Sequence, residues 1–248
     1  MNVKVFLLAT ALTVCASLHA STSYTFDFTN QDLNQKSTLG GGLVFNSNIG
    51  AGLTVTATAF STADLTHTLL QQAYVGEYSG NGIGICTVAE GGAACVGAQH
   101  QVDNSGQFEF MLLTFSAQVN LSSITLHNTG GSTDMDMSYW TSPTFMTLNG
   151  TNISTVGQKN DLCGGGGSQP ACNPTALVDP LSTPGNTQVR SLLIAAAYTP
   201  GVTGGDAIAD FFKISSLIVT TPEPASFVLI GSGLLIGAGI GRRRMKKK

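Results

Sequence analysis

The chain has 248 residues, of which 10% are charged, with 30 glycines and five cysteines. Seven of its 11 basic residues lie in the two end segments, so the stretch from Asp27 to Glu223 holds four basic residues against 14 acidic ones, a net charge near −10. Such a surface repels phosphate backbones and argues against nucleic-acid binding, whereas it attracts cations. The four central basic residues are Lys36, Lys159, Arg190 and Lys213.

Residues 1–20 have the layout of a bacterial signal peptide. Lys4 gives a positively charged start, an apolar run extends from Val5 to Leu18, and Ala20 is a small residue at the expected cut. Cleavage after Ala16 is the alternative, because bulky Leu18 lies three residues before the first site. We therefore predict export, with removal of residues 1–20 by signal peptidase.

The central region, residues 21–221, reads as short strands separated by glycine- and asparagine-rich turns. Tyr24–Phe28 and Leu53–Phe60 alternate apolar and polar side chains, the period-two pattern of a half-buried strand. No long amphipathic helical pattern is present, so we predict an all-β fold: one antiparallel β-sandwich or jelly-roll-like domain in which two sheets bury their alternate faces. Further strands are expected at 108–115, 119–126, 145–148, 189–196 and 211–219, the first two of these forming a hairpin joined at Ser116–Gln118.

Four cysteines remain after signal-peptide removal, in two pairs with eight intervening residues each. An even number of cysteines in an exported chain favours disulfides. Three connectivities exist, and local closure as Cys86–Cys95 and Cys163–Cys172 is the simplest. Each bridge would constrain a glycine-rich loop and stabilise the fold by about 2–4 kcal/mol. A four-cysteine metal site is the alternative, but its ligands usually lie two to four residues apart.

Motifs that carry chemistry are few in the central region. No Gly-x-Ser-x-Gly motif of a hydrolase is present. The run Gly80–Gly84 resembles a nucleotide-binding loop but lacks the helix that such a loop needs, so we interpret it as a turn. We predict no catalytic residues. Asp103 and Asn104 stand at a strand-to-loop junction and are candidate calcium ligands, with turn formation as the competing interpretation. No cofactor is predicted beyond this calcium alternative.

Three further features have two interpretations each. Asp134 and Asp136 would point the same way on a strand, as metal ligands or catalytic groups, or as solvated surface carboxylates. Trp140 beside Tyr139 would offer a sugar-stacking platform, or it packs in the core. The central histidines lack the spacing of a zinc protease; they are His67, His100 and His127.

The C-terminal tail, residues 222–248, has three parts. The Pro-Glu-Pro run 222–224 interrupts the preceding strand, because proline lacks the N–H that a ladder needs. Residues 225–241 carry no charge and would span about 25 Å as a transmembrane helix. The basic end 242–248 would stay cytoplasmic by the positive-inside rule and leave the domain outside.

This tail resembles the PEP-CTERM sorting signal. The resemblance implies a protein of a Gram-negative bacterium that passes through the inner membrane and is cut near the motif by an exosortase. The product would then join the cell surface or the exopolysaccharide matrix. Transferred by position, the recognition motif is Pro222, Glu223 and Pro224, the temporary anchor is Phe227–Ile240, and the stop-transfer cluster is Arg242, Arg243 and Arg244. A permanent C-terminal anchor is the alternative.

Two main hypotheses follow for the domain itself. The first is a non-catalytic surface or matrix protein that binds or associates with exopolysaccharide. The second is a secreted glycan or peptide hydrolase that uses carboxylates such as Asp103 and Asp134, which would have to face one cleft about 5–10 Å apart. A purely structural protein that assembles with itself is a third hypothesis.

Overall fold

The computed structural model describes residues 22–29, 35–49, 52–78, 80–92, 100–127, 135–157, 159–162, 177–180, 188–199 and 209–221. Residues Ser23–Thr220 form one compact unit, and all strands of the described residues belong to it. Within the described residues there is no α-helix, only a short 3₁₀ turn at Ile153–Thr155. The all-β prediction is therefore confirmed for this part of the chain.

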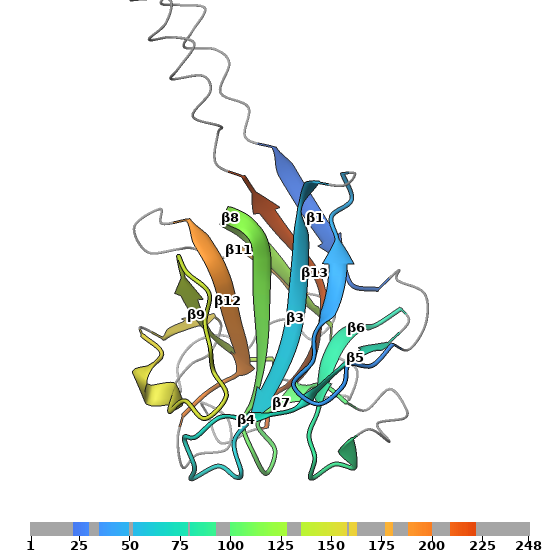
Figure 1. Cartoon of the computed structure of the whole chain (residues 1–248). Helices are drawn as coiled ribbons and strands as arrows, with labels where there is room; N and C mark the ends of the chain where they lie inside the picture. Colours follow the sequence, from blue (N-terminus) through green and yellow to red (C-terminus); the bar gives the residue numbers. More distant parts are fainter. Residues whose placement is uncertain are drawn as a thin grey trace, which may run out of the picture. The chain divides into compact units, whose positions relative to one another are not determined.

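Every strand pairing is antiparallel (Figure 1). The strands are β1 (Ser23–Asp27), β2 (Leu43–Asn46), β3 (Thr54–Ser61), β4 (Gln71–Gln72), β5 (Tyr74–Tyr78), β6 (Gly82–Cys86), β7 (Val102–Asp103), β8 (Glu109–His127), β9 (Met137–Ser142), β10 (Asn160–Leu162), β11 (Leu177–Pro180), β12 (Val189–Ala196) and β13 (Phe211–Thr220).

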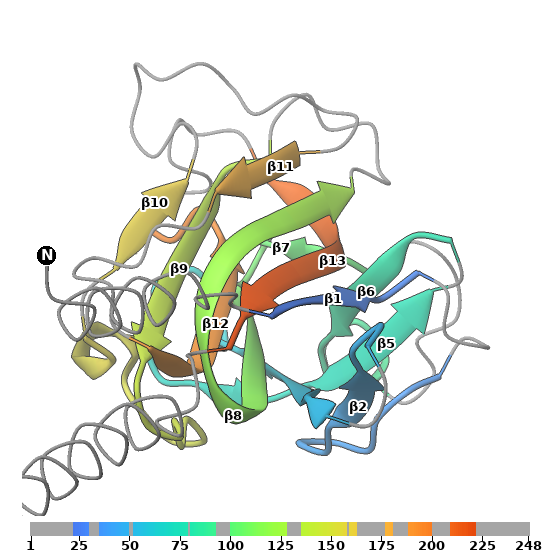
Figure 2. The same ribbon diagram turned by 90° about the horizontal axis from the view of Figure 1, so that it is seen from above.

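The 19-residue strand β8 organises the fold because its two halves pair with different strands. The first half lies between β3 and β12, with Phe110 opposite both Phe60 and Ala195. The second half lies between β13 and β11, with Leu126 opposite both Ile214 and Leu177. Figure 2 shows β8 curling as it passes from one set of neighbours to the other.

The hairpin predicted at Ser116–Gln118 is wrong, since these residues continue β8 without a turn. The segment Ser116-Ala117-Gln118 contains no glycine, proline, asparagine or aspartate to reverse the chain. Two separate sheets were also expected, but the hydrogen-bonded strands form one 13-stranded sheet. The reason is the same: a continuous β8 joins what would otherwise be two sheets.

The main core lies where this sheet folds over itself. Residues from both halves of β8, including Leu113 and Ile124, pack there with Phe26 and Phe45. The Phe28 and Phe45 rings meet edge to face with centroids 4.9 Å apart, a favourable aromatic geometry. Alternate side chains of β8 thus pack into this core, as the period-two pattern predicts for a strand.

A second apolar cluster covers the outer face of β8, β9 and β12. Phe110 and Leu112 of β8 point into it, whereas Met111 and Leu113 point into the main core. Trp140, only 2% exposed, packs here against Phe110 and Tyr198. Its burial rules out the sugar-stacking platform and leaves the core-packing interpretation.

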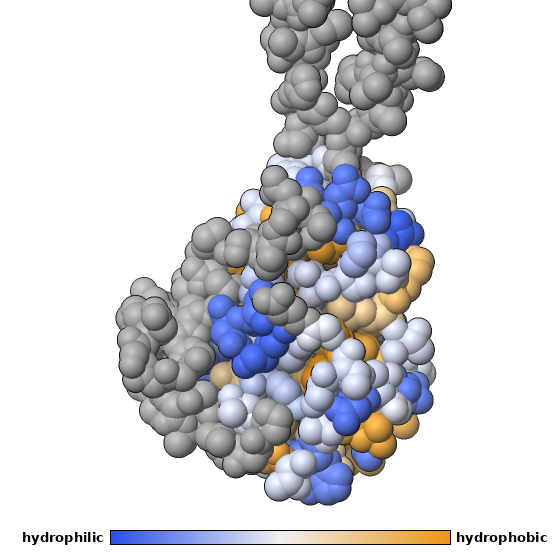
Figure 3. Space-filling view, turned by 90° about the vertical axis from the view of Figure 1, so that its left-hand side faces the viewer, coloured by the Kyte–Doolittle hydropathy of each residue, from blue (hydrophilic) through white to orange (hydrophobic). Residues whose placement is uncertain are grey.

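Most other strand predictions are confirmed, with ends shifted by at most a residue or so. Segments 24–28, 53–60, 189–196 and 211–219 correspond to β1, β3, β12 and β13. Segment 145–148 is not a strand: it lies over β12, where the N–H of Met146 donates to Oγ of Ser191 at 3.2 Å. Large exposed apolar side chains are scattered along the described chain, and on the face in Figure 3 hydrophobic and hydrophilic residues are interspersed.

The run Gly80–Gly84 is a β-turn and the start of β6, not a nucleotide loop. The N–H of Asn81 donates to the carbonyl oxygen of Tyr78 at 2.8 Å and closes the β5–β6 hairpin. Gly82 has φ of +104° and lies against the Ile214 carbonyl, so a side chain there would overlap β13. The turn interpretation therefore holds for Gly80 and Asn81, while Gly82 and Gly84 belong to the strand.

Candidate metal centre

Strand β7, which ends at Asp103, lies at the end of the sheet opposite to the start of β1 and the end of β13 (Figure 1). Strand β13 begins at Phe211, opposite Asp103, and ends at Thr220, opposite Ser23. Nine steps of about 3.3 Å place these two ends of β13 roughly 30 Å apart. The site around Asp103 is therefore distant from the edge where the chain enters and leaves the domain.

Three carboxylates from separate segments converge at this site. Glu90 lies in the turn after β6, Asp103 ends β7, and Glu109 begins β8. One oxygen from each lies within 4.8 Å of the others. We call Glu90, Asp103 and Glu109 the carboxylate cluster.

Backbone amides hold each carboxylate of the cluster in place. The Asp103 N–H donates to Oε2 of Glu109 at 3.0 Å, and the Ser105 N–H donates to Oδ1 of Asp103 at 2.9 Å. The Thr87 N–H donates to Oε2 of Glu90, also at 3.0 Å. These bonds fix the directions of the side chains relative to the sheet.

Burial gives the cluster unusual electrostatics. Asp103 and Glu109 are 7% and 1% exposed. Burial raises the pKa of Asp103 to about 7; the Ser105 amide opposes this shift and the charge of Glu90 adds to it. Burial, followed by the charges of Asp103 and Glu90, raises the pKa of Glu109 well above its usual range. The cluster therefore favours a bound proton or a bound cation over three free negative charges.

One oxygen of the cluster has no hydrogen-bond donor among the described residues. Oε2 of Glu109 accepts from Asp103, but its buried Oε1 has no hydrogen-bond donor within the described part of the chain. A buried acceptor without a donor destabilises the fold by about 1–3 kcal/mol, and by more when it is charged. A proton shared with the Glu90 side chain, whose hydrogen bond adds to the rise in the pKa of Glu109, or a cation would satisfy this atom.

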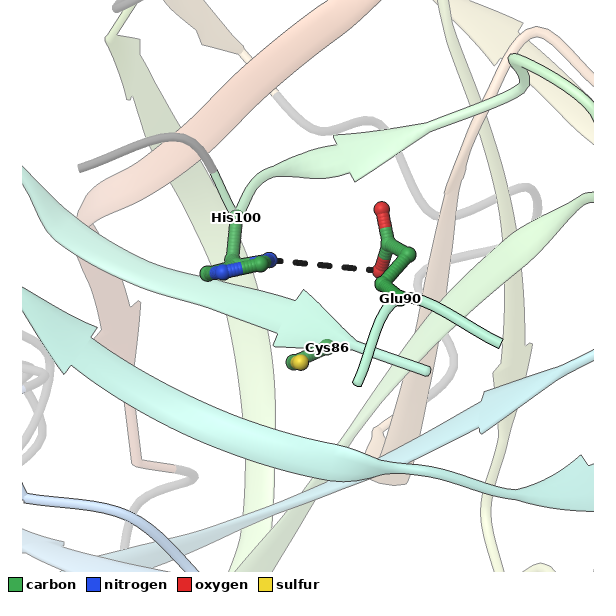
Figure 4. Close-up of side chains that lie close together, drawn as sticks. All are labelled: Cys86, Glu90 and His100. Carbon is green, nitrogen blue, oxygen red and sulfur yellow. Dashed lines mark ion pairs between the residues drawn. The ribbon is translucent and has the colours of Figure 1, made fainter. Parts of the chain in front are cut away.

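His100 and Cys86 flank Glu90 on its other side (Figure 4). Nδ1 of His100 lies 4.0 Å from Oε2 of Glu90, and the two side chains point toward each other. The pKa of His100 is lowered, chiefly by burial, so the ring is neutral near physiological pH. The sulfur of Cys86 is in a disulfide whose partner lies outside the described residues, so it offers no thiolate to a metal.

The structure does not bring Asn104 to the side of Asp103. Nδ2 of Asn104 donates to Oδ2 of Asp210 at 2.8 Å and to the Ala197 carbonyl at 3.2 Å. Successive side chains of an extended segment point to opposite sides, which separates Asn104 from the carboxylate cluster. Of the two predicted calcium ligands, only Asp103 lies in the cluster.

Sequence reasoning missed Glu90 and Glu109. Glu109 did carry a signal, because it is a single charge within the apolar run Phe108–Leu113. Glu90 carried only a local one: together with Thr87 it forms a tight turn, in which the Thr87 N–H and Oγ1 both reach Oε2 of Glu90. Their convergence depends on strand pairing that no local pattern encodes.

Several predicted residues lie outside the described part of the chain. They are the signal peptide 1–20, Cys95, Cys163, Cys172, Asp134, the sorting motif Pro222–Pro224, the apolar segment 225–241 and the basic cluster Arg242–Arg244. The disulfide pairings and the transmembrane helix therefore stay predictions. Among the described residues, no helix is long and apolar enough to cross a membrane. Asp136 is described; it is buried just before β9, where its N–H donates to Oδ1 of Asp210 at 2.9 Å.

Comparison with known proteins identifies the tail but not the domain. The family description "PEP-CTERM protein-sorting motif" matches residues 220–244, which include the Pro-Glu-Pro run, the apolar segment and the arginines. No curated protein and no solved structure matches the chain. The predicted resemblance is thus confirmed: the chain carries a PEP-CTERM motif, which implies export and processing by an exosortase.

Proposed function

We propose that this chain is a surface or extracellular-matrix protein of a Gram-negative bacterium. An exosortase releases it by cutting near Pro222–Pro224, and its β domain is non-catalytic and associates with exopolysaccharide. The observation that carries the proposal is the position of the motif: the match begins at Thr220, the last residue of β13. The sorting signal therefore follows the last strand of the domain with almost no linker.

The pairing of the domain's two ends supports release by cleavage. Thr220 lies opposite Ser23, and the Thr221 N–H donates to the Thr22 carbonyl at 3.2 Å. The last hydrogen bond of this β1–β13 ladder thus forms just before Pro222. A cut within or after the motif would leave every described strand pairing intact, so the released domain would keep its sheet.

The buried carboxylates support a binding role over hydrolysis. Glycosidases hold two carboxyl groups on either side of a substrate bond, about 5–5.5 Å apart in retaining enzymes and about 6.5–9.5 Å apart in inverting ones. Asp103 and Glu109 instead share one buried site, and the Asp103 amide binds the Glu109 carboxylate directly. Because both side chains are at most 7% exposed, they do not line a surface open to a sugar chain.

The test is the intact mass of the protein recovered from cells and from the culture matrix, before and after reduction. The proposal expects a matrix form that begins near Ser21, ends near Pro222–Pro224 and gains about four mass units on reduction of two disulfides. A variant with Pro222→Ala and Pro224→Ala should remain in the membrane fraction with its basic end. A wild-type protein that keeps Arg242–Lys248 in the membrane would instead establish a permanent anchor.

Exopolysaccharide association needs a separate readout. The mature protein should co-sediment with matrix polysaccharide from the same cells, and turnover of that polysaccharide should not increase when the protein is added. Release of reducing sugar that Asp103→Asn abolishes would favour the hydrolase hypothesis instead.

A further inference from the structure

We propose that Glu90, Asp103 and Glu109 bind one divalent cation of the calcium class. This inference stands apart from the sorting proposal, because it concerns the β domain alone. Its test therefore succeeds or fails whether or not an exosortase cuts the tail.

The donor atoms select the kind of cation. The three carboxylates supply only oxygen, in a space where one oxygen of each lies within 4.8 Å of the others. Hard cations such as Ca²⁺ take oxygen ligands, whereas zinc and copper prefer sites that include sulfur or imidazole nitrogen. Because the sulfur of Cys86 is already in a disulfide, the neighbouring group Cys86, Glu90 and His100 lacks the thiolate that would make it a zinc site.

The buried side chain of Glu109 also points to a bound cation. It is 99% buried, and its Oε1 has no hydrogen-bond donor in the part of the chain that the structure describes, while its Oε2 is oriented by the Asp103 amide. A free buried carboxylate oxygen beside two other carboxylates is strongly unfavourable without a counter-charge. A cation in contact with this atom would satisfy it and offset the repulsion among the three groups.

The surrounding structure holds the ligands ready for the ion. Thr87 fixes Glu90 through its N–H and hydroxyl groups, and the Gln107 side chain donates in turn to the Thr87 hydroxyl. Ligands fixed before binding lose little entropy when the ion arrives. The Glu90 side chain is 34% exposed, so it gives the ion a route from solvent to the two buried carboxylates.

The compartment suits a weak site of this kind. Extracellular calcium modules typically have dissociation constants of about 10⁻⁴–10⁻³ M, which match millimolar calcium outside the cell. The acidic stretch from Asp27 to Glu223, with a net charge near −10, would also raise the local cation concentration. Water molecules would complete the coordination, because calcium takes about six to eight oxygens.

The experiment uses the full chain in detergent with its disulfides intact, stripped with EDTA and held at a pH above the Asp103 pKa of about 7. Calorimetric titration with CaCl₂ should show one ion per chain with a dissociation constant of about 10⁻⁴–10⁻³ M. Glu90→Gln and Asp103→Asn should each weaken binding by about tenfold or more, since each removes a charged ligand. Glu109→Gln should do the same and report on the buried oxygen.

Asp161→Asn is the matched control, because Asp161 and Glu90 side chains are 33% and 34% exposed and Asp161 lies outside the cluster. Calcium should raise the melting temperature of the wild type and of Asp161→Asn, but not of Glu90→Gln at the same concentration. Glu90→Gln changes a half-exposed turn residue, so circular dichroism should show it folded even where Glu109→Gln is not.

Absence of calcium heat in the wild type would overturn the proposal. So would equal binding by Glu90→Gln and Asp161→Asn, or a site that prefers Zn²⁺ and ignores the carboxylate variants.

Discussion

Asn104 and Asp210 exchange two hydrogen bonds although they lie 106 positions apart in the chain. Nδ2 of Asn104 donates to Oδ2 of Asp210 at 2.8 Å, and the Asp210 N–H donates to Oδ1 of Asn104 at 2.9 Å. Oδ1 of Asp210 also accepts from the N–H of Asp136. This buried pair therefore joins the segments that precede β9 and β13 to the segment that follows β7, beside the carboxylate cluster.

The first prediction concerns this pair. Asn104→Ala should lower the free energy of unfolding by about 3 kcal/mol, because it leaves the buried Asp210 carboxylate short of a donor. The matched control is Asn48→Ala, since Oδ1 of Asn48 accepts one exposed bond, from the Thr25 N–H. That variant should cost less than about 1 kcal/mol. Equal losses in urea unfolding would show that the Asn104–Asp210 pair contributes no special stability.

The second prediction concerns pH in the metal-free protein. Asp103 has a folded pKa of about 7 against an ordinary value of 3.8, so between these values the folded state keeps a proton that the unfolded state has released. Stability should therefore be greatest near the lower value, fall as pH rises through this window, and level off above it. The fall from Asp103 is roughly 4 kcal/mol, since each pKa unit is worth about 1.4 kcal/mol, and Glu109 acts in the same direction.

Urea unfolding in EDTA across this pH window measures the effect. Asp103→Asn should flatten much of the slope, because its side chain does not titrate. A wild-type stability that rises between the two pKa values would show that Asp103 is ionised in the folded protein.

The sequence predicts those parts of this structure that depend on neighbouring residues, and not those that depend on long-range strand pairing. Strand β12 was predicted with both ends correct, because Val189–Ala196 is largely apolar and follows a turn-rich segment. Strands β5 and β6 were not predicted, and the run Gly80–Gly84, which includes the start of β6, was interpreted as a turn. In the structure, Gly82 and Gly84 are needed because β13 and the His100 backbone pass too close for a side chain.

The candidate site shows the same limit. Asp103 was identified from its junction with a loop, a local feature. Its partnership with Glu109 requires β7 and β8 to meet, and the separation of Asn104 from the cluster requires the segment before β13 to supply Asp210. Long-range pairings of this kind follow from topology, and β8 in particular was predicted as a hairpin. A wrong topology could not have placed these side chains correctly.

The third prediction uses Trp140, the one tryptophan of the chain. Trp140→Ala should lower the free energy of unfolding by about 3–5 kcal/mol, because it leaves a cavity beside Phe110 and Tyr198. Trp140→Phe should cost less, since it keeps an aromatic ring in the cluster. Polysaccharide should leave the fluorescence of Trp140 unchanged, because the ring is buried. Quenching by added sugar would contradict this placement.

The fourth prediction tests the close approach of β6 and β13. Gly82→Ala should lower the free energy of unfolding by about 2–4 kcal/mol, because φ is +104° at this residue and a Cβ would overlap the Ile214 carbonyl. Gly52→Ala is the control, since Gly52 has no atom within 4 Å of an added Cβ. That variant should change stability by less than about 0.5 kcal/mol.

Gly82→Ala also links the fold to the site. Strand β13 pairs with both β6 and β7, through Ile214 opposite Ile83 and Phe211 opposite Asp103. A shift of β13 away from β6 would therefore move Asp103 relative to Glu90, which lies in the turn after β6. We expect Gly82→Ala to weaken calcium binding as well as stability, whereas Gly52→Ala should change neither. Calcium affinity that stays at the wild-type value in a destabilised Gly82→Ala protein would show that the cluster tolerates movement of β13.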